Sequence, residues 1–239
     1  QFEIPVVQGG EVSFYVGDEK KTVHLVRAHL ELGGNSALIV LPGADVAKAA
    51  SAGAFGSFMH QGQICMSVER VIVHEAVADE FIAKFVANTK KLKVGNPREM
   101  ANCIGPIINQ KQLDKIREQV DDAVAKGAKV LCGGKHQGLF FEPTVLTNVT
   151  RDMKIMRDET FGPVAPVITV GSVDEAIDVA NESEYGLSAG IITRNEERGL
   201  AVARRLHTGM AHINDSSVND EPHVPFGGVR WSGLGRHGA

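Results

Sequence analysis

This sequence has no excess of basic residues. It contains 25 lysines and arginines against 29 aspartates and glutamates, which gives a formal net charge of −4. A protein that binds nucleic acid through charge needs an excess of basic residues to displace the counterions of the phosphates. The composition therefore excludes a nucleic-acid binder of that kind, and we expect no nucleic-acid partner.

Long apolar runs are also missing. No run reaches the roughly 18 residues that a membrane-spanning helix needs. The sequence begins with QFEIPVVQGG, which lacks a basic stretch followed by an apolar one, so no secretory leader is visible. We expect a cytoplasmic protein with no membrane partner.

Cysteine is scarce. The 239 residues include three cysteines, at Cys65, Cys103 and Cys132. An odd number without close pairs argues against a disulfide framework, and the lack of C-x-x-C and H-E-x-x-H motifs argues against zinc. We expect no bound metal, and we interpret Cys103 and Cys132 as structural residues.

The rest of the composition is that of a globular protein, with 43% hydrophobic and 23% charged residues. Short apolar runs that indicate strands occur at 37–41, 70–73, 164–170, 187–193 and 209–214. Helical patterns occur at 45–60, 77–92, 109–126, 173–181 and 195–207. This alternation predicts an α/β fold with one mostly parallel sheet covered by helices.

The two ends of the sequence depart from this alternation. Residues 1–30 contain polar and charged stretches and no convincing long element. The last residues, SGLGRHGA, form a glycine-rich turn of the kind that normally connects two elements. We therefore expect both ends to be cut from something larger.

Three residues carry candidate chemistry, and each has a plainer alternative. Cys65 lies close to Gly62 in GQIC and is a nucleophile or a small buried hydrophobic residue. Glu31 stands before two glycines and is a general base or a solvated acid. Glu159 precedes the turn FGP and either accepts hydrogen bonds from a pair of ligand hydroxyls or stabilises the turn. Local sequence alone leaves these alternatives open.

Five motifs occur together and in a fixed order. They are LELGG (30–34), GQIC (62–65), ETFGP (159–163), YGLSAGI (185–191) and PFGG (225–228) followed by SGLGR (232–236). With this set the sequence resembles the NAD(P)-dependent aldehyde dehydrogenase family, from about residue 23 onward. The resemblance implies the catalytic-domain half of that fold, with residues 31–239 as the catalytic domain and residues 1–30 as a divergent remnant of the cofactor-domain side.

The resemblance also implies catalytic roles. Cys65 attacks the aldehyde carbonyl to form a thiohemiacetal, and loss of hydride to the nicotinamide leaves a thioester on the enzyme. Glu31 activates the water that hydrolyses this thioester and helps to deprotonate Cys65. Because members that transfer the acyl group to coenzyme A usually lack an acid at this position, Glu31 favours a free carboxylic acid as the product.

The remaining roles concern the ligands. Glu159 holds the nicotinamide ribose, Phe161 packs near the nicotinamide, and Gly33 belongs to the same cofactor-binding set. Asn214 and Phe226 lie on the substrate side. The stretch HINDSSVNDEPHVPFGG is similar to members that oxidise aromatic aldehydes such as benzaldehyde, vanillin and salicylaldehyde, so we expect a small aromatic aldehyde as substrate.

One departure from the family pattern concerns the cofactor phosphates. Where members carry a glycine-rich turn shortly before LELGG, this sequence reads SFYVGDEKK, so the usual phosphate loop is absent. The cofactor is NAD or NADP, and the sequence allows a homo-oligomer. Two alternatives stay open beside the dehydrogenase. They are a residual thiol esterase that uses Cys65 and Glu31 without a cofactor, and a folded module without dehydrogenase activity.

Overall fold

A central sheet of seven strands organises the molecule. The computed structural model describes residues 11–16, 19–24 and 29–238. Across the sheet, the strands are β12 (Met210–Ile213), β11 (Ser188–Ile192), β4 (Ser36–Val40), β5 (Val68–His74), β10 (Val164–Val170), β9 (Thr144–Thr147) and β6 (Lys129–Cys132). All neighbours pair in parallel except β6, which is antiparallel to β9.

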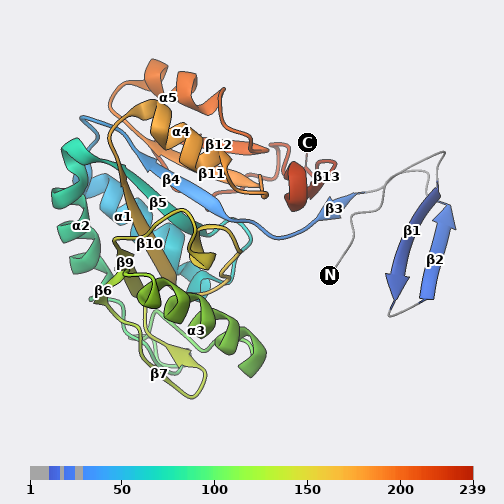
Figure 1. The fold of residues 1–239 in the computed structure, drawn as a ribbon, viewed down its shortest axis with the longest axis horizontal. Coiled ribbons are helices and arrows are strands. Elements are labelled where there is room, and N and C mark those ends of the chain that lie inside the picture. The colour runs from blue at the N-terminus through green and yellow to red at the C-terminus, as the bar shows by residue number, and fades with distance from the viewer. Residues whose placement is uncertain (1–10, 17–18, 25–28, 239) are drawn as a thin grey trace.

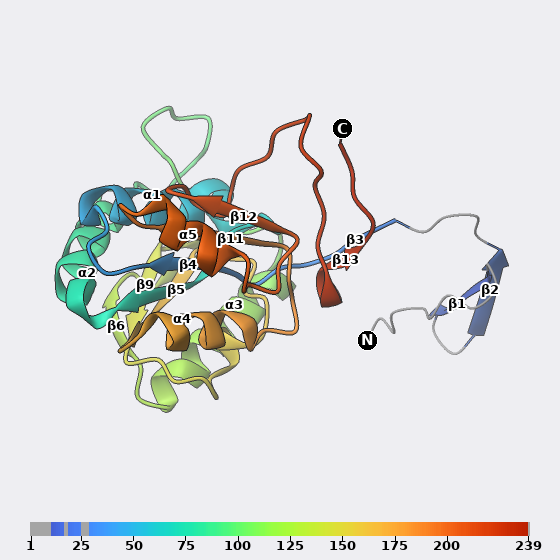
Figure 2. The ribbon, with the colours of Figure 1, turned by 90° about the horizontal axis from the view of Figure 1, so that it is seen from above.

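Helices cover both faces of the sheet (Figures 1 and 2). They are α1 (Val46–Phe58), α2 (Glu75–Thr89), α3 (Gln110–Ala125), α4 (Val173–Asn181) and α5 (Glu196–Ala203). One apolar core joins the sheet to α1 and α2, and a second joins the opposite face to α3, α4 and α5. The predicted α/β fold is confirmed. Among the described residues, no helix combines the length and the apolar character needed to cross a membrane.

The sequence of β4 shows why the sheet is buried on both sides. Leu38 and Val40 point into the core with α1 and α2, whereas Ala37 and Ile39 point into the other core. All four side chains are almost fully buried. A strand that is covered on both faces needs a continuous apolar run rather than an alternating one, which is the pattern that the sequence shows here.

The order of the strands brings three motifs to one edge. β4, β5 and β10 are parallel neighbours. The motifs LELGG, GQIC and ETFGP each precede one of them, so all three lie at the amino ends of adjacent strands. Segments 125 residues apart in the sequence therefore meet, as the bond from the Gly34 amide to the Glu159 carboxylate shows.

Short elements complete the fold. β3 (Leu30–Glu31) pairs antiparallel with β13 (Gly233–Leu234), which brings the SGLGR motif beside Glu31. The others are β7 (His136–Gln137), β8 (Phe140–Phe141) and the 3-10 helices η1 (Met59–Gly62), η2 (Lys154–Met156) and η3 (Arg230–Ser232).

The N-terminal segment differs from the expectation. We expected no long element in residues 1–30, and this was wrong, because β1 (Glu11–Val16) and β2 (Glu19–His24) form an antiparallel hairpin. Figures 1 and 2 draw this hairpin apart from the main sheet. The predicted boundary after residue 30 falls inside β3, and the division at that point stays a prediction.

Candidate active site

The Cys65 loop leaves α1 through a strained turn. His60 and Gln61, in η1, have φ angles of 53° and 59°, a left-handed conformation that non-glycine residues rarely adopt. Such residues cost of the order of 1–3 kcal/mol each and persist only where the surroundings enforce them. Gln63, two residues before Cys65, accepts through Oε1 a hydrogen bond of 2.9 Å from the Ile108 amide. This bond ties the cysteine loop to the segment that precedes α3.

The Cys65 thiol is partly buried, and its surroundings favour the neutral form. Burial raises the pKa of Cys65 most, and the negative charge of Glu31 raises it further. Glu159 adds a smaller effect in the same direction, while the backbone N–H groups of Cys65 and Met66 lower the pKa. The resting group is therefore a thiol, and it needs a base before it can act as a nucleophile.

Glu31 is the carboxylate whose charge acts most strongly on the Cys65 thiol. Burial raises the pKa of Glu31, and the positive charges of His237 and Arg236 act against this increase. A methyl group added to Gly227 would lie 3.3 Å from Glu31 Oε1, so the PFGG motif borders this carboxylate. A raised pKa makes Glu31 a stronger base than an ordinary glutamate.

Two glycines let the three motifs approach closely. A Cβ atom on Gly33 would lie 2.6 Å from Glu159 Oε1, and one on Gly34 would lie 2.1 Å from the Cys65 carbonyl oxygen. The Gly34 amide donates a hydrogen bond of 2.8 Å to Glu159 Oε1. Any side chain at either glycine would push these groups apart. The structure thus brings Cys65, Gly33 and Glu159 together.

Side chains that the sequence reasoning missed hold the segment after Glu159. The Glu69 carboxylate accepts the backbone N–H groups of Thr160 and Phe161 at 2.7 and 2.6 Å. From α3, Gln112 Nε2 donates to the carbonyl oxygens of both residues, and Gln119 Oε1 accepts the Thr160 hydroxyl. The signal that could have revealed Glu69 is a charged pair, Glu-Arg, written directly before the buried run VIV.

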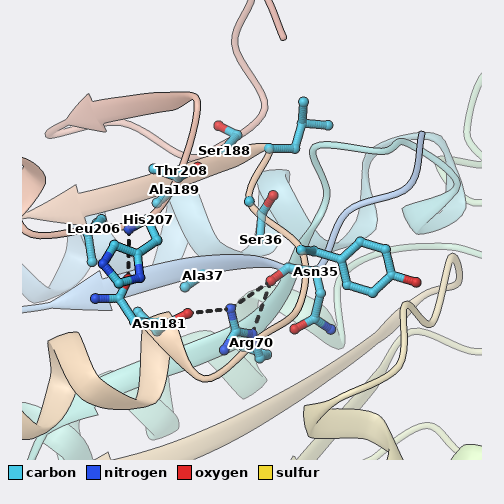
Figure 3. A pocket seen from close by; sticks show the side chains of 14 residues that line it. Asn35, Ser36, Ala37, Arg70, Asn181, Ser188, Ala189, Leu206, His207 and Thr208 are labelled. Carbon is cyan, nitrogen blue, oxygen red and sulfur yellow. Dashed lines mark hydrogen bonds between the residues drawn. The ribbon is translucent and has the colours of Figure 1, made fainter. Parts of the chain in front are cut away.

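The second member of that pair fixes the neighbouring turn. Arg70 donates from Nε and Nη2 to the Asn35 carbonyl oxygen at 3.0 and 2.9 Å (Figure 3). It also donates to the Val179 and Ala180 carbonyl oxygens at the end of α4. A buried guanidinium is stabilised by such carbonyl oxygens. Arg70 therefore anchors the start of β4, directly after Gly34.

The substrate-side residues lie in different places. Phe226 is partly buried and pairs with the backbone of His237, beside Glu31. Asn214 follows β12, and its Oδ1 accepts the Thr193 amide at 3.0 Å, so the structure places it at the carboxyl edge of the sheet, not against Cys65. Its φ of 63° turns the chain back, and Ser217 then donates to the Met66 carbonyl oxygen at 2.6 Å.

Metal ligands and disulfides do not add to the site. Among the described residues, no group of three or more histidine, cysteine, aspartate or glutamate side chains could hold a metal ion. Cys65, Cys103 and Cys132 are free cysteines. Cys103 is exposed and Cys132 is partly buried, and burial raises the pKa of Cys132.

Comparison with known proteins decides the family. The sequence model described as the aldehyde dehydrogenase family matches residues 10–239. The chain belongs to the aldehyde dehydrogenase family. Vanillin dehydrogenase from an Amycolatopsis strain is 53% identical over 212 residues, which cover 89% of this chain and 44% of that protein. The resemblance stated from the sequence is confirmed.

Solved structures agree with this assignment. Salicylaldehyde dehydrogenase from Pseudomonas putida G7, complexed with salicylaldehyde, matches with a TM-score of 0.85 at 47% identity over 87% of this chain and 44% of its own. The NADP complex of the NADP-dependent glyceraldehyde-3-phosphate dehydrogenase from Bacillus halodurans C-125 matches with a TM-score of 0.86 at 40% identity over 88% and 44%. The chain spans less than half the length of these dehydrogenases.

Proposed function

We propose that this chain carries the catalytic centre of an aldehyde dehydrogenase, which oxidises an aromatic aldehyde to a carboxylic acid with NAD or NADP. The observation that carries the proposal is the meeting of three motifs at one edge of the sheet. There, Glu31 and Glu159 both lie close enough to Cys65 to raise its pKa. Gly33 lies against Glu159 and Gly34 against the Cys65 backbone, with no side chain between them.

Formation of the first covalent intermediate uses Cys65 and Glu31. Glu31 takes the thiol proton, the sulfur attacks the aldehyde carbon, and the carbonyl electrons move onto oxygen to give a thiohemiacetal. The backbone N–H groups of Cys65 and Met66 lower the pKa of the thiol, so they already favour negative charge at this position. Donors of this kind also stabilise an oxyanion that forms beside the sulfur.

Part of a nicotinamide cofactor fits this site. When bound, the nicotinamide supplies the acceptor for the hydride that leaves the thiohemiacetal carbon. Glu159 uses Oε1 for the Gly34 amide, which leaves Oε2 to accept a ribose hydroxyl. The missing Cβ of Gly33 keeps that carboxylate accessible, and Phe161, partly exposed beside it, would pack near the nicotinamide.

The phosphate side of the cofactor does not fit in the same way. The described residues before LELGG form the β1–β2 hairpin. They contain no turn leading into a helix N-terminus, which is the usual cradle for a dinucleotide phosphate. We therefore assign only the nicotinamide end of the cofactor to this chain, with NAD and NADP left as equal candidates.

Release of the product again uses Glu31. The proton that Glu31 took from the thiol first passes to solvent. In the proposed step, Glu31 then takes a proton from water while the oxygen attacks the thioester carbon. The carbon–sulfur bond breaks, the acid leaves, and Glu31 returns its proton to the sulfur to restore the thiol. Because Glu31 is exposed at the end of β3, water can reach it.

The aromatic substrate class is supported by the relatives. The names of similar proteins include vanillin, benzaldehyde and salicylaldehyde dehydrogenases. Phe226 is partly buried, and the next residue, Gly227, lies against Glu31, so its ring is a candidate for the aromatic side of the substrate pocket. We propose that Asn214 contributes to the substrate side indirectly. It reverses the direction of the chain, which brings Ser217 to the Met66 carbonyl oxygen beside Cys65.

Location and assembly remain part of the proposal. We place the protein in the cytoplasm because its three cysteines are free thiols, which suits a reducing compartment. A homo-oligomer is compatible with this site, because Cys65, Glu31 and Glu159 all come from one chain.

The test is reduction of NAD or NADP by the purified chain with benzaldehyde, with Cys65→Ala as the inactive variant and Cys103→Ala as its matched control. We expect reduced cofactor and benzoate from the parent and from Cys103→Ala, and neither from Cys65→Ala. Ester hydrolysis that depends on Cys65 without any cofactor reduction would instead support the thiol esterase. Loss of both activities would support a folded module without catalysis.

A further inference from the structure

Glu69 is a buried carboxylate for which the reaction described above has no use. Glu69 lies on β5, four residues after Cys65, and is 2% exposed. Its Oε1 accepts the Phe161 amide at 2.6 Å, and its Oε2 accepts the Thr160 amide at 2.7 Å. Asn35 Nδ2 donates to Oε2 at 3.3 Å. All of these donors belong to the two turns that flank the cysteine loop.

The shape of the segment explains why a carboxylate binds there. Thr160 and Phe161 present two successive backbone N–H groups, and Phe161 has a left-handed φ of 50°. Successive amides in such a turn form a concave site for an anion. A carboxylate that bonds both amides fixes both peptide planes, and these planes set the direction in which the preceding residue, Glu159, extends.

A second connection returns to the same carboxylate. Glu159 Oε1 accepts the Gly34 amide at 2.8 Å, and Gly34 is followed directly by Asn35, which donates to Glu69. Glu69 therefore bonds to a neighbour of each partner in the bond between Glu159 and Gly34: to Thr160, after Glu159, and to Asn35, after Gly34. Loss of its acceptors would loosen both ends of that bond together.

The cost of this arrangement argues that it does more than fill space. A buried carboxylate loses its hydration, and burial together with the nearby Glu159 charge raises the pKa of Glu69 to about 8. An apolar side chain would avoid this cost, but it would leave the Thr160 and Phe161 amides without an acceptor and the turn without its shape.

We infer that Glu69 is a positioning residue that aims the Glu159 carboxylate at the ribose hydroxyls of a nicotinamide nucleotide. This inference rests on the proposed function, because that function assigns the ribose to Glu159. It adds a residue outside the motifs, which acts on the ligand only through the backbone of Thr160 and Phe161.

The experiment compares Glu69→Gln with the parent chain. Glutamine keeps the size but replaces one acceptor oxygen by a donor, which opposes one of the two amides. Glu80→Gln, at an exposed position of α2, is the matched control. Glu69→Asp keeps the carboxyl group but shortens the side chain, and it serves as a second variant if the glutamine variant does not fold.

Three quantities are measured on each variant: amide hydrogen exchange, binding of reduced NAD or NADP by nicotinamide fluorescence, and alkylation of Cys65 by iodoacetamide. In Glu69→Gln we expect exchange about ten-fold faster at Thr160, Phe161 and Gly34, and binding weaker by about ten-fold or more, the size of one lost hydrogen bond to a charged group. Cys65 alkylation stays within about two-fold of the parent, and Glu69→Asp gives intermediate exchange.

Two results would overturn the inference. One is unchanged exchange at Gly34, which would show that Glu69 does not control the Glu159 bond. The other is faster exchange throughout β4 and β5 together with altered Cys65 alkylation, which would make Glu69 a general stability residue. Failure of the parent chain to bind either reduced cofactor would count against the proposed function, whereas the exchange at Gly34 still decides the role of Glu69.

Discussion

Cys65 depends on its neighbours for its reactivity. Burial and the charge of Glu31 raise the pKa of the thiol, so the sulfur is not pre-ionised. The same Glu31 is the group that we propose as its base. Its charge therefore has two opposite effects, since it disfavours the free thiolate but provides an acceptor for the thiol proton.

These opposite effects can be separated with Glu31→Gln. Removing the negative charge lowers the pKa of Cys65, which raises the thiolate fraction at a fixed neutral pH. We expect alkylation of Cys65 by iodoacetamide to become roughly two- to ten-fold faster, while hydrolysis of an acylated Cys65 becomes slower. Slower alkylation in Glu31→Gln than in the exposed control Glu80→Gln would contradict this account.

A second test at the residue scale uses the glycines of the LELGG turn. In Gly34→Ala the new Cβ would lie 2.1 Å from the Cys65 carbonyl oxygen, a distance that the backbone must relieve by moving. We expect a loss of about 2 kcal/mol or more in the free energy of unfolding, measured by urea denaturation. Gly171→Ala is the control, because its Cβ would meet nothing closer than 3.8 Å; equal stability of the two variants would argue against the close approach.

The sequence predicted some of these residues and not others for a physical reason. Cys65, Glu31 and Glu159 each lie inside a short motif, and the resemblance identified them from that local context. The hydrogen-bond partners of Glu69 are amides 91 and 92 residues away in the sequence, and no local pattern predicts them. Asn214 shows the opposite case, because the stretch around it was recognised, while the bond that its side chain accepts from the Thr193 amide is visible only in the structure.

At the scale of elements, α3 links the fold to the site. Leu113, Ile116 and Val120 pack in the core, and the same buried face carries Gln119, which is 3% exposed. Gln119 Nε2 donates to the Glu159 carbonyl oxygen, and its Oε1 accepts the Thr160 hydroxyl. The helix thus holds the segment that carries Glu159, in addition to the bonds from Glu69 on β5.

This link predicts a difference between two glutamines of the same helix. Gln119→Ala leaves the Thr160 hydroxyl without an acceptor and opens space in the core, so we expect a loss of about 1–3 kcal/mol in the free energy of unfolding. Gln110→Ala, at the exposed first turn, removes only a bond to Asp114 and should change stability by less than about 0.5 kcal/mol. Thermal denaturation of both variants measures this difference, and similar losses would contradict the role given to α3.

The elements themselves were largely predictable. The helices α1 to α5 and the strands β4, β5, β10, β11 and β12 follow from local sequence patterns, and 164–170 and 173–181 coincide with β10 and α4. The sequence analysis did not give β9. The β1–β2 hairpin was missed because its two strands pair with each other and not with the main sheet, and a strand rich in charged residues, EKKTVH, has no apolar alternation to reveal it.

For the whole molecule, the order of the strands determines where the chemistry lies. Three motifs that are widely separated in the sequence meet because β4, β5 and β10 are parallel neighbours. The sequence predicted a mostly parallel sheet but not the order of its strands, since any order would bury the same apolar runs. The meeting of the motifs was therefore inferred from the resemblance and is visible only in the structure.

The buried pair of acids also gives the molecule a pH dependence. The pKa of Glu69 rises from its ordinary value of 4.5 to about 8, and burial raises the pKa of Glu159 as well. Between pH values of about 4.5 and about 8, Glu69 is ionised in the unfolded chain but keeps its proton in the folded chain. The free energy of unfolding therefore falls as the pH rises through this range. Urea denaturation across this range should show a steeper decline in the parent than in Glu69→Gln, and parallel declines would contradict the assignment.

In the proposed reaction, Cys65 carries the acyl group during aldehyde oxidation. The most direct measurement is mass spectrometry of Glu31→Gln after incubation with benzaldehyde and NAD or NADP. In this variant the pKa of Cys65 is lower, so solvent can take the thiol proton and the thioester can form, whereas its hydrolysis has lost its base. The account predicts a benzoyl group on the peptide that contains Cys65, present only when the cofactor is added. The absence of that adduct, or its appearance on Cys103 and Cys132 to the same extent, would contradict it.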